Sequence, residues 1–324
     1  MALLLSYENM QGVLAMRDAV DLLEQAAHHE FAGQTVVSPR LNSNFEDGWM
    51  RILFAADHAA GYAATKAYHR VAGSGVRYIV TLYRLADGEP LALLDGRLIT
   101  DLRTGAASGV VARQVAIKGP VNVGIIGAGN QARAQLQSLA AVHDIQSATV
   151  FSPTPARRET FAREMSAELG FTVTAVESAE RAVRGMNVVA TASSAQGGEP
   201  VLLGAWLDEC RLLCAVGNTR PQFMEADVAC FADAALVVVD TPNALTETGE
   251  LKEAVAAGVL PEHKQATVAQ VVGGAHIVPA DGRIAFKSAG TALQDLALAV
   301  RYYELLREQP DVLQAPALTS LRAK

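Results

Sequence analysis

The chain has 324 residues, which at roughly 150 residues per domain predicts two domains. Half of its residues are hydrophobic and 19% are charged, and this composition excludes a largely disordered chain, because disorder requires low hydrophobicity with high net charge. The formal net charge of -7 provides no basic surface for a phosphate backbone. Nucleic acid is therefore excluded as a partner.

The sequence also argues against a membrane partner and against a metal site. No apolar run approaches the ~18 residues that a membrane helix needs, and residues 1–8 lack the basic start and long apolar core of an export signal. A cytoplasmic protein is expected. Because no histidine lies at zinc-ligand spacing from Cys210, Cys214 or Cys230, these residues are predicted to be buried, reduced thiols, and no metal is expected.

The first hundred residues predict an amphipathic helix followed by an antiparallel or mixed sheet. Apolar residues recur at helical spacing over residues 16–27. Short strands are expected at residues 35–37, 49–56 and 62–68, and a hairpin at residues 76–85 and 90–94. The Asp87-Gly88 pair between the hairpin strands suits a tight turn. Thr100 is the expected N-cap of a helix that ends near Gly119-Pro120, a typical stop signal.

After that Gly-Pro pair, short apolar runs alternate with helical stretches. The runs occupy residues 121–126, 148–151, 171–176, 188–192, 212–216 and 236–239. Such alternation is typical of a parallel sheet covered by helices on both faces. The second half is therefore predicted to be doubly wound α/β.

A glycine-rich turn follows the first of these runs. The segment from Gly127 to Ala132 fits the pattern G-x-G-x-x-A between a buried strand and a helix, the signature of a Rossmann-type dinucleotide site. The first glycine allows the tight turn, and the second lets a pyrophosphate approach the backbone at the positive end of the helix. The expected cofactor contacts in this turn are Gly127, Ala128, Gly129, Asn130 and Gln131.

The end of the second strand indicates which dinucleotide is bound. No carboxylate stands there to bind the ribose hydroxyls of NAD. Ser152 and Thr154 can donate hydrogen bonds, and Arg157 or Arg158 can pair with a 2′-phosphate, so NADP(H) is favoured and NAD(H) remains possible. At the end of the fourth strand, Thr191 and Ser193 face the crevice where open α/β sheets bind ligands, and their hydroxyls are expected to contact the cofactor.

Four motifs occur in a recognisable order. They are D-L-R-T-G-A-A-S at residues 101–108, G-A-G-N-Q-A at 127–132, A-V-G-N-T-R-P at 215–221 and F-K-S-A-G-T-A-L-Q-D at 286–295. Together they resemble the ornithine cyclodeaminase/mu-crystallin family over about residues 16–308. The resemblance implies a homodimer in which an α+β substrate and dimerisation domain, residues 1–118 plus 296–324, receives the Rossmann-type domain, residues 119–295, as an insertion.

The resemblance also implies roles for individual residues. Arg40 and Arg103 correspond to the arginines that bind the substrate carboxylate, and Lys66 to the active-site lysine. Arg103 was also expected in the first turn of its helix, where the helix dipole would assist anion binding. Without the resemblance, Lys66 and Arg40 would be interpreted as solvated cations. The motifs further assign Thr104, Gly217, Lys287, Ser288 and Gly290 to the cofactor region, and Asp295 is expected to cap the last helix.

One departure from the family pattern narrows the predicted reaction. True ornithine cyclodeaminases resemble one another in an aspartate two residues after the glycine of the A-V-G motif, whereas this chain has Thr219, which cannot act as a carboxylate base. The stretch is more similar to the mu-crystallin branch, whose members resemble ketimine reductases. We therefore predict NAD(P)H-dependent reduction of the C=N bond of an α-imino acid, with Lys66 as the proton source and Thr219 orienting the substrate nitrogen.

Three alternatives remain at this point. The first is an amino-acid dehydrogenase of the alanine dehydrogenase type, in which the imine forms in the site from a 2-oxo acid and ammonia. The second is a deaminase similar to ornithine cyclodeaminase. The third is a cofactor-dependent ligand-binding protein without catalytic activity.

Overall fold

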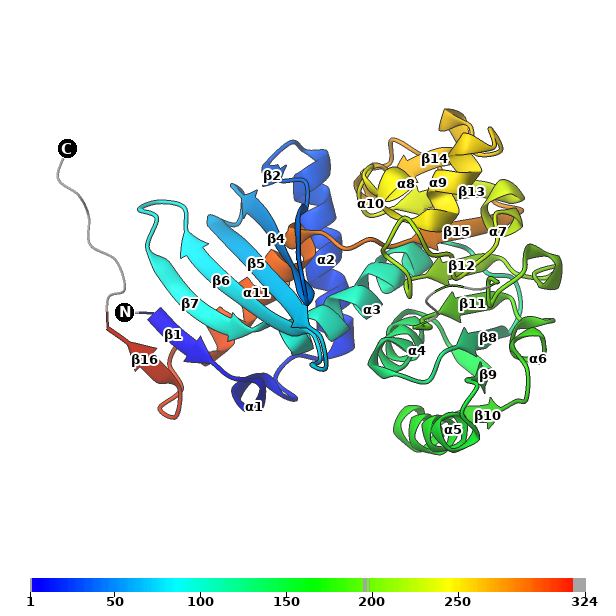
Figure 1. Ribbon diagram of the computed structural model, residues 1–324, viewed down its shortest axis with the longest axis horizontal. Coiled ribbons are helices and arrows are strands. Elements are labelled where there is room, and N and C mark those ends of the chain that lie inside the picture. The colour runs from blue at the N-terminus through cyan, green and yellow to red at the C-terminus, as the bar shows by residue number, and fades with distance from the viewer. Residues whose placement is uncertain (1, 195–196, 198, 317–324) are drawn as a thin grey trace. The chain divides into compact units, whose positions relative to one another are not determined.

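The computed structural model describes residues 2–194, 197 and 199–316, and the chain divides into two compact units. Unit 1 comprises Met1–Arg103 and Thr291–Lys324, and unit 2 comprises Thr104–Gly290. The chain enters unit 2 along helix α3 (Gly96–Gln114) and returns to unit 1 before helix α11 (Ala292–Leu306) (Figure 1). The division thus lies inside α3, whereas the sequence suggested the Gly119-Pro120 pair.

Unit 1 is a mixed sheet with helices packed against it. Its remaining elements are β1 (Ala2–Leu5), α1 (Tyr7–Met10), α2 (Met16–Phe31), β2 (Thr35–Val37), β3 (Leu41–Phe45), β4 (Gly48–Asp57), β5 (Tyr62–Val71), β6 (Arg77–Arg84), β7 (Pro90–Asp95) and β16 (Leu313–Ala315). The strand order is β16-β1-β7-β6-β5-β4-β2, with β3 paired to β4. The helix at α2 and the strands at β2 and β4 to β7 are confirmed; β1, β3 and β16 were not predicted.

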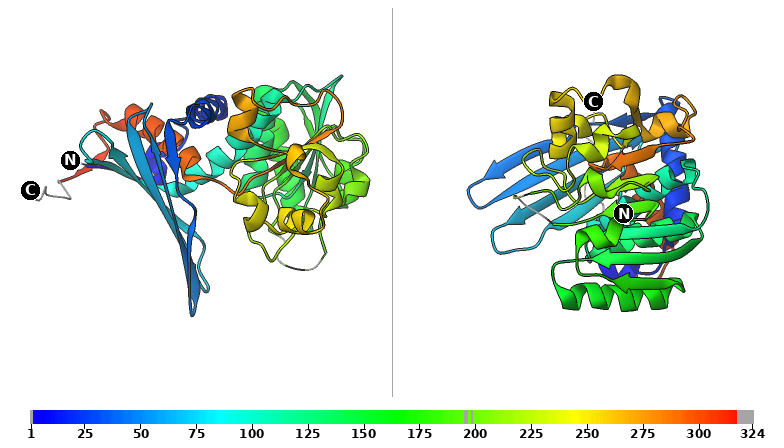
Figure 2. Two further views of the ribbon diagram at one scale, coloured as in Figure 1. Left: turned by 90° about the horizontal axis from the view of Figure 1, so that it is seen from above. Right: turned by 90° about the vertical axis from the view of Figure 1, so that its right-hand side faces the viewer.

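The two faces of the sheet in unit 1 differ in what covers them. Register places Leu53, Lys66 and Val80 side by side on one face, because each is paired with the next across β4, β5 and β6. Helix α11 packs against these strands and against α2, and Figure 2 shows both helices on one side of the sheet. Since side chains alternate along a strand, Ile52 and Ile79 lie on the opposite face.

Helix α3 begins earlier than the sequence suggested, which corrects two expectations. It starts at Gly96, so Thr100 is not its N-cap but lies inside the helix, where its hydroxyl donates to Gly96 O at 2.6 Å. Arg103 consequently lies two turns into the helix, too far from the N-terminus to benefit from the helix dipole. Glycine is required at the start because a Cβ there would lie 2.8 Å from Tyr78 Cβ.

Unit 2 is the predicted doubly wound α/β domain. Its elements are β8 (Val121–Ile126), α4 (Asn130–Val142), β9 (Ile145–Phe151), α5 (Pro155–Leu169), β10 (Thr172–Ala175), α6 (Ala179–Val183), β11 (Val188–Thr191), β12 (Leu212–Ala215), α7 (Ala229–Ala232), β13 (Ala234–Val239), α8 (Ala244–Glu247), α9 (Gly249–Ala256), β14 (Gln265–Thr267), α10 (Val268–Val272) and β15 (Arg283–Lys287).

All the pairings in this sheet are parallel, in the order β10-β9-β8-β11-β12-β15-β13-β14. The order reverses between β8 and β11, and right-handed crossovers therefore place α4 and α5 on one face and α6 on the other. All six predicted strands are confirmed. Strand β15, which was not predicted, is inserted between β12 and β13, so the motif at residues 286–295 begins at a strand end within this sheet.

The cap of α11 corrects a further expectation. Thr291, not Asp295, is the N-cap: its hydroxyl accepts from Gln294 N, and Gln294 Oε1 accepts from Thr291 N, which forms a capping box. Asp295 lies one residue further into the helix and is 2% exposed. Its carboxylate is therefore available for contacts with other segments.

The three cysteines are free and buried, as predicted. Burial raises the pKa of Cys210 and Cys214 to about 12, so both thiols are protonated at neutral pH. Within the described part of the chain, no helix is long and apolar enough to cross a membrane. The same residues contain no group of three His, Cys, Asp or Glu side chains that could hold a metal ion.

Candidate functional site

The glycine-rich turn of unit 2 has the geometry that a dinucleotide needs. Gly127 has φ +115°, and a Cβ there would lie 2.5 Å from Ala192 O, so only glycine fits. A Cβ at Gly129 would meet no atom within 4 Å, which leaves open space beside the turn. Gly129 is the N-cap of α4, no side chain caps this helix, and Ala132 is fully buried against the strand. These residues fit a diphosphate group.

The end of β9 presents hydroxyl groups and a guanidinium. Ser152 follows the strand and is 7% exposed, and its carbonyl accepts from Arg158 Nη1 at 3.0 Å. Thr154 is the N-cap of α5 but makes no side-chain cap hydrogen bond, and Arg157 lies exposed in the first turn of that helix. Arg158 thus holds the backbone, whereas Arg157 is the cation oriented toward solvent.

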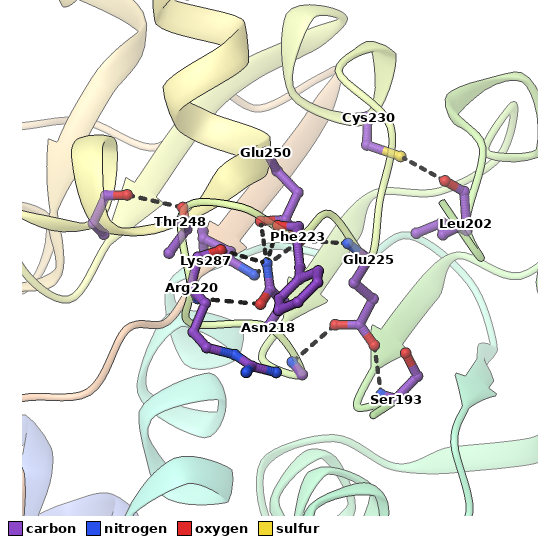
Figure 3. A network of polar contacts seen from close by, with 12 residues as sticks. Ser193, Leu202, Asn218, Arg220, Phe223, Glu225, Cys230, Thr248, Glu250 and Lys287 are labelled. Carbon is purple, nitrogen blue, oxygen red and sulfur yellow. Dashed lines mark hydrogen bonds and ion pairs between the residues drawn. The ribbon is translucent and has the colours of Figure 1, made fainter. Parts of the chain in front are cut away.

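Buried carboxylates, for which no sequence pattern provides a signal, bind backbone N–H groups of the residues that follow β11, β12 and β15. Glu225 accepts from Ser193 N at 2.5 Å and from Gly217 N at 2.8 Å (Figure 3). Asp240 accepts from Ser288 Oγ at 2.7 Å, Ala289 N at 2.9 Å and Gly290 N at 2.7 Å. These hydrogen bonds therefore hold Ser193, Gly217 and residues 288–290 in place without any ligand.

Two of the predicted cofactor contacts in this region are buried side chains. Thr191 is 0% exposed, and the ammonium of Lys287 is also fully buried, 3.3 Å from Glu250 Oε1. Thr104 is 6% exposed in α3, and its carbonyl accepts from Gln135 Nε2 at 3.1 Å. The contacts of these three residues with a cofactor stay predictions. Their burial, and the hydrogen bonds of Lys287 and Thr104, show that they also belong to the packed interior of unit 2.

Unit 1 contains a buried charged cluster centred on Lys66. Lys66 Nζ donates to Asp295 Oδ1 at 2.7 Å and to Thr100 Oγ1 at 2.7 Å, and Lys66 is 2% exposed. The pairing joins strand β5 to helix α11 and to helix α3. Asp295, which the sequence suggested only as a cap, is thus the partner of the predicted active-site lysine.

Arg103 belongs to the same cluster, and Arg40 lies within electrostatic range of it. Arg103 Nε lies 3.4 Å from Asp295 Oδ1, and its Nη1 donates to Gln294 Oε1 at 3.3 Å. Arg40 is half-buried in the turn between β2 and β3, and its charge acts on Lys66. The three cations that the family resemblance singled out are therefore brought together in unit 1, with one carboxylate among them.

The cluster places Lys66 in an unusual protonation equilibrium. The pKa of Lys66 is lowered to about 8, chiefly by burial; Arg103 and Arg40 also lower it, and Asp295 opposes the change. The stacked rings of Tyr68 and Tyr78 lie 5.8 and 5.3 Å from Lys66 Nζ. A lysine that titrates near neutral pH can donate a proton in a reaction and take it back from water.

Thr219 lies in unit 2, half-buried in the loop that follows β12. The neighbouring Asn218 holds the backbone of this loop, since its side-chain amide donates to Arg220 O at 3.1 Å and to Phe223 O. The catalytic role of Thr219 stays a prediction. The loop that contains it is the one whose glycine, Gly217, contacts Glu225.

Comparison with known proteins agrees with this geometry. Residues 2–309 match the ornithine cyclodeaminase/mu-crystallin family. An alanine dehydrogenase from Archaeoglobus fulgidus is 31% identical, covering 93% of this chain and 94% of that protein. The structure of a Thermococcus litoralis Δ1-pyrroline-2-carboxylate reductase in complex with NADH and L-proline has a TM-score of 0.89 and 30% identity to this chain. The match covers 97% of this chain and 100% of the reductase. An archaeal alanine dehydrogenase dimer with bound NAD has a TM-score of 0.88 and 27% identity, covering 97% and 99% of the two chains. The chain therefore belongs to the ornithine cyclodeaminase/mu-crystallin family.

Proposed function

We propose that the protein is an oxidoreductase that reduces the C=N bond of an α-imino acid to an amine, with NAD(P)H as the hydride donor. The observation that supports this most directly is the buried Lys66, whose pKa is lowered to about 8 beside Asp295 and two arginines. The similarity to a reductase of Δ1-pyrroline-2-carboxylate, a cyclic α-imino acid, supports the same substrate class.

In this proposal, Arg103 and Arg40 bind the substrate carboxylate. Guanidinium groups bind carboxylates in a bidentate geometry, which fixes the orientation of the plane of the imino acid. Arg103 is itself held by Asp295 and Gln294, so its position is set before the substrate arrives. Correct placement of this kind is worth several kcal/mol of the reaction barrier.

Lys66 supplies the proton. Two of its three N–H bonds point to Asp295 and Thr100, and the third is the one that can donate to the imine nitrogen. An iminium carbon accepts a hydride more readily than a neutral imine carbon, so proton donation and hydride acceptance support each other. Thr219 orients the substrate nitrogen or a water through its hydroxyl.

The nicotinamide cofactor, which supplies the hydride when bound, would be held by the glycine-rich turn of unit 2. We propose a preference for NADP(H), supported by the absence of a carboxylate at the described end of β9 and by the exposed Arg157 beside Ser152 and Thr154. Arg157→Ala is expected to raise the KM for NADPH about ten-fold with little effect on the KM for NADH. Equal effects on both would refute the preference.

The proposed activity is tested by initial rates of NAD(P)H oxidation with Δ1-pyrroline-2-carboxylate. Lys66→Met is expected to reduce turnover at least 1000-fold while leaving NAD(P)H binding unchanged, because Lys66 lies in unit 1 and the glycine-rich turn in unit 2. Cofactor binding without reduction of any cyclic or open-chain α-imino acid would instead favour a ligand-binding protein. Full activity of Lys66→Met would refute the role of the lysine.

A second candidate is an alanine dehydrogenase, which the similarity to the Archaeoglobus fulgidus protein favours. Such an enzyme would bind the same carboxylate and reduce an imine formed from pyruvate and ammonia. The two functions are distinguished by ammonium dependence. Turnover of pyruvate with ammonium that exceeds turnover of Δ1-pyrroline-2-carboxylate would favour the dehydrogenase.

We further propose that the protein is a homodimer formed through the face of the unit 1 sheet on which Ile52 and Ile79 lie, opposite the face against which α11 packs. That face carries exposed apolar side chains on neighbouring strands, including Leu41, Ile52, Ile79 and Leu93. The alanine dehydrogenase with this fold is a dimer. Light scattering is expected to give twice the chain mass for the wild type and a monomer for Ile79→Lys; an unchanged mass for the variant would refute this face as the interface.

A further inference from the structure

Glu225 connects the residues that follow two adjacent strands of unit 2. Its carboxylate accepts from Ser193 N, which follows β11, through Oε1 at 2.5 Å, and from Gly217 N, which follows β12, through Oε2 at 2.8 Å. Both loops lie at the carboxyl ends of adjacent parallel strands. Glu225 is 0% exposed, so water does not compete for these hydrogen bonds.

The position of Glu225 is fixed through its own backbone. Its N–H donates to Glu250 Oε1 at 2.7 Å, and its carbonyl accepts from Val201 N at 2.9 Å and from Leu202 N at 3.1 Å. Glu250 in turn pairs with Lys287 at 3.3 Å, with both side chains fully buried (Figure 3). We name Glu225, Glu250 and Lys287 together the Glu225 cluster.

The packing around the carboxylate explains a glycine of the A-V-G-N-T-R-P motif. A Cβ at Gly217 would lie 2.5 Å from Glu225 Oε1 and 2.5 Å from Ser193 O. The backbone conformation does not require glycine here, since Gly217 is not among the residues with positive φ. Glycine is needed because the carboxylate and the neighbouring loop lie directly against the backbone at this position.

The location of the two loops assigns them to one half of the dinucleotide. In a sheet of this order, the adenosine half lies over the strands on either side of the glycine-rich turn and its helix, here β8 and β9. The second set of strands, β11 and β12 among them, carries the nicotinamide half. The hydrogen bonds of Glu225 thus hold the loops under the reactive end of the cofactor.

We infer that Glu225 is a positioning residue that holds Ser193 and Gly217, which follow β11 and β12, in the geometry that the nicotinamide half of the cofactor requires. The inference rests on the proposed function. Ordering a free loop removes backbone conformational entropy, and a loop that is already ordered does not lose that entropy when the ligand binds. Glu225 therefore increases the affinity for the nicotinamide half without touching it.

The experiment compares NADH with ADP-ribose, which lacks the nicotinamide ring. In Glu225→Gln the side chain keeps one acceptor oxygen but turns an NH2 group toward one of the two backbone N–H donors, so one loop is released. We expect the dissociation constant for NADH to rise about ten-fold and that for ADP-ribose to change less than two-fold. Isothermal titration measures both, independently of activity.

Asp227→Asn is the matched control. Asp227 also accepts from two backbone N–H groups, Gly204 N at 2.9 Å and Cys230 N at 3.1 Å, but these belong to the 3-10 turn Gly204–Trp206 and to α7. Both N–H groups donate to Asp227 Oδ1, an oxygen that asparagine keeps, so Asp227→Asn removes the negative charge without releasing either segment, and only Glu225→Gln is expected to change the NADH to ADP-ribose ratio. Equal changes for both ligands, or no change in Glu225→Gln, would overturn the inference.

Two further outcomes are informative. If Glu225→Gln does not fold, Gly217→Ala displaces the same loop while the carboxylate remains, and the same separation of NADH from ADP-ribose is expected; its absence would overturn the inference. If the wild type binds neither NADH nor NADPH, the proposed function fails as well. If the wild type binds both NADH and ADP-ribose and Glu225→Gln loses affinity for both to the same extent, the positioning role is refuted and the proposed function is not.

Discussion

Replacing Asp295 with asparagine tests the central electrostatic argument. Asp295 Oδ1 lies 2.7 Å from Lys66 Nζ, and both side chains are 3% exposed. Asparagine keeps the size of the side chain and a hydrogen-bond acceptor for Lys66, and it removes the negative charge. The substitution therefore changes the electrostatics of Lys66 with little change in packing.

The direction and size of the effect follow from the structure. The pKa of Lys66 is about 8 with Asp295 in place, and Asp295 is the group that raises it against burial and against Arg103 and Arg40. An adjacent opposite charge shifts a pKa by about 1–3 units, so without Asp295 the pKa of Lys66 falls well below 8. The protonated fraction at about pH 8 then decreases about five-fold or more.

The assay is the pH dependence of kcat/KM for imine reduction. If Lys66 must be protonated, kcat/KM falls as the pH rises through the pKa of Lys66. In Asp295→Asn this alkaline limb is expected to move to lower pH, and activity at acidic pH is expected to remain. The ionisation of the substrate affects both proteins equally, so the difference between their profiles reports the enzyme.

Asp87→Asn is the control for this experiment. Asp87 also pairs with a cation, Arg84, at 2.8 Å, but both side chains are about half exposed. Its profile is expected to match the wild type. A uniform loss of activity in Asp295→Asn at every pH, with the alkaline limb unmoved, would refute the argument that Lys66 is the proton donor controlled by Asp295.

Three further predictions follow from the same contacts. Gly127→Ala forces a Cβ to within 2.5 Å of Ala192 O at a φ of +115°. We expect this strain to lower the unfolding free energy by about 1–3 kcal/mol and to weaken NADH binding. A variant that matches the wild type in urea unfolding and in NADH titration would contradict this prediction. Arg103→Lys keeps the charge but loses the planar guanidinium, so the KM for the imino acid is expected to rise about ten-fold while the KM for NAD(P)H stays the same. A change in the KM for NAD(P)H alone would exclude Arg103 as a carboxylate ligand. The pKa of Lys66 is about 8 in the folded protein, against an ordinary value of 10.5. Between these two pH values the unfolded state binds more protons than the folded state, so the unfolding free energy rises with pH by about 3 kcal/mol. Lys66→Met should lack this rise, which denaturant unfolding of both proteins at about pH 7 and 10.5 measures.

Local physics is enough to predict those features whose signals lie close together in the chain. The Asp87-Gly88 hairpin and the strand–turn–helix at Gly127 each combine a hydrophobic period with residues that only certain turns accept, and both signals lie within a dozen residues. The doubly wound half follows from the same kind of signal. The start of α3 was misjudged because Gly96 begins the helix where Tyr78, from a neighbouring strand, leaves no space for a side chain, and no local signal records that contact.

The polar partners of the site come from segments that are distant in the chain and meet only in the folded protein. Lys66 and Asp295 are separated by 229 positions in the chain and Glu225 and Ser193 by 32, and neither pair has a spacing that a sequence pattern could reveal. The proton affinity of a buried group is set by how completely water is removed and by which charges lie within a few ångströms. Both quantities exist only once the sheet, α3 and α11 have packed together, so the family resemblance could single out Lys66, Arg40 and Arg103, but the buried partners of Lys66 and its proton affinity could not be read from the sequence.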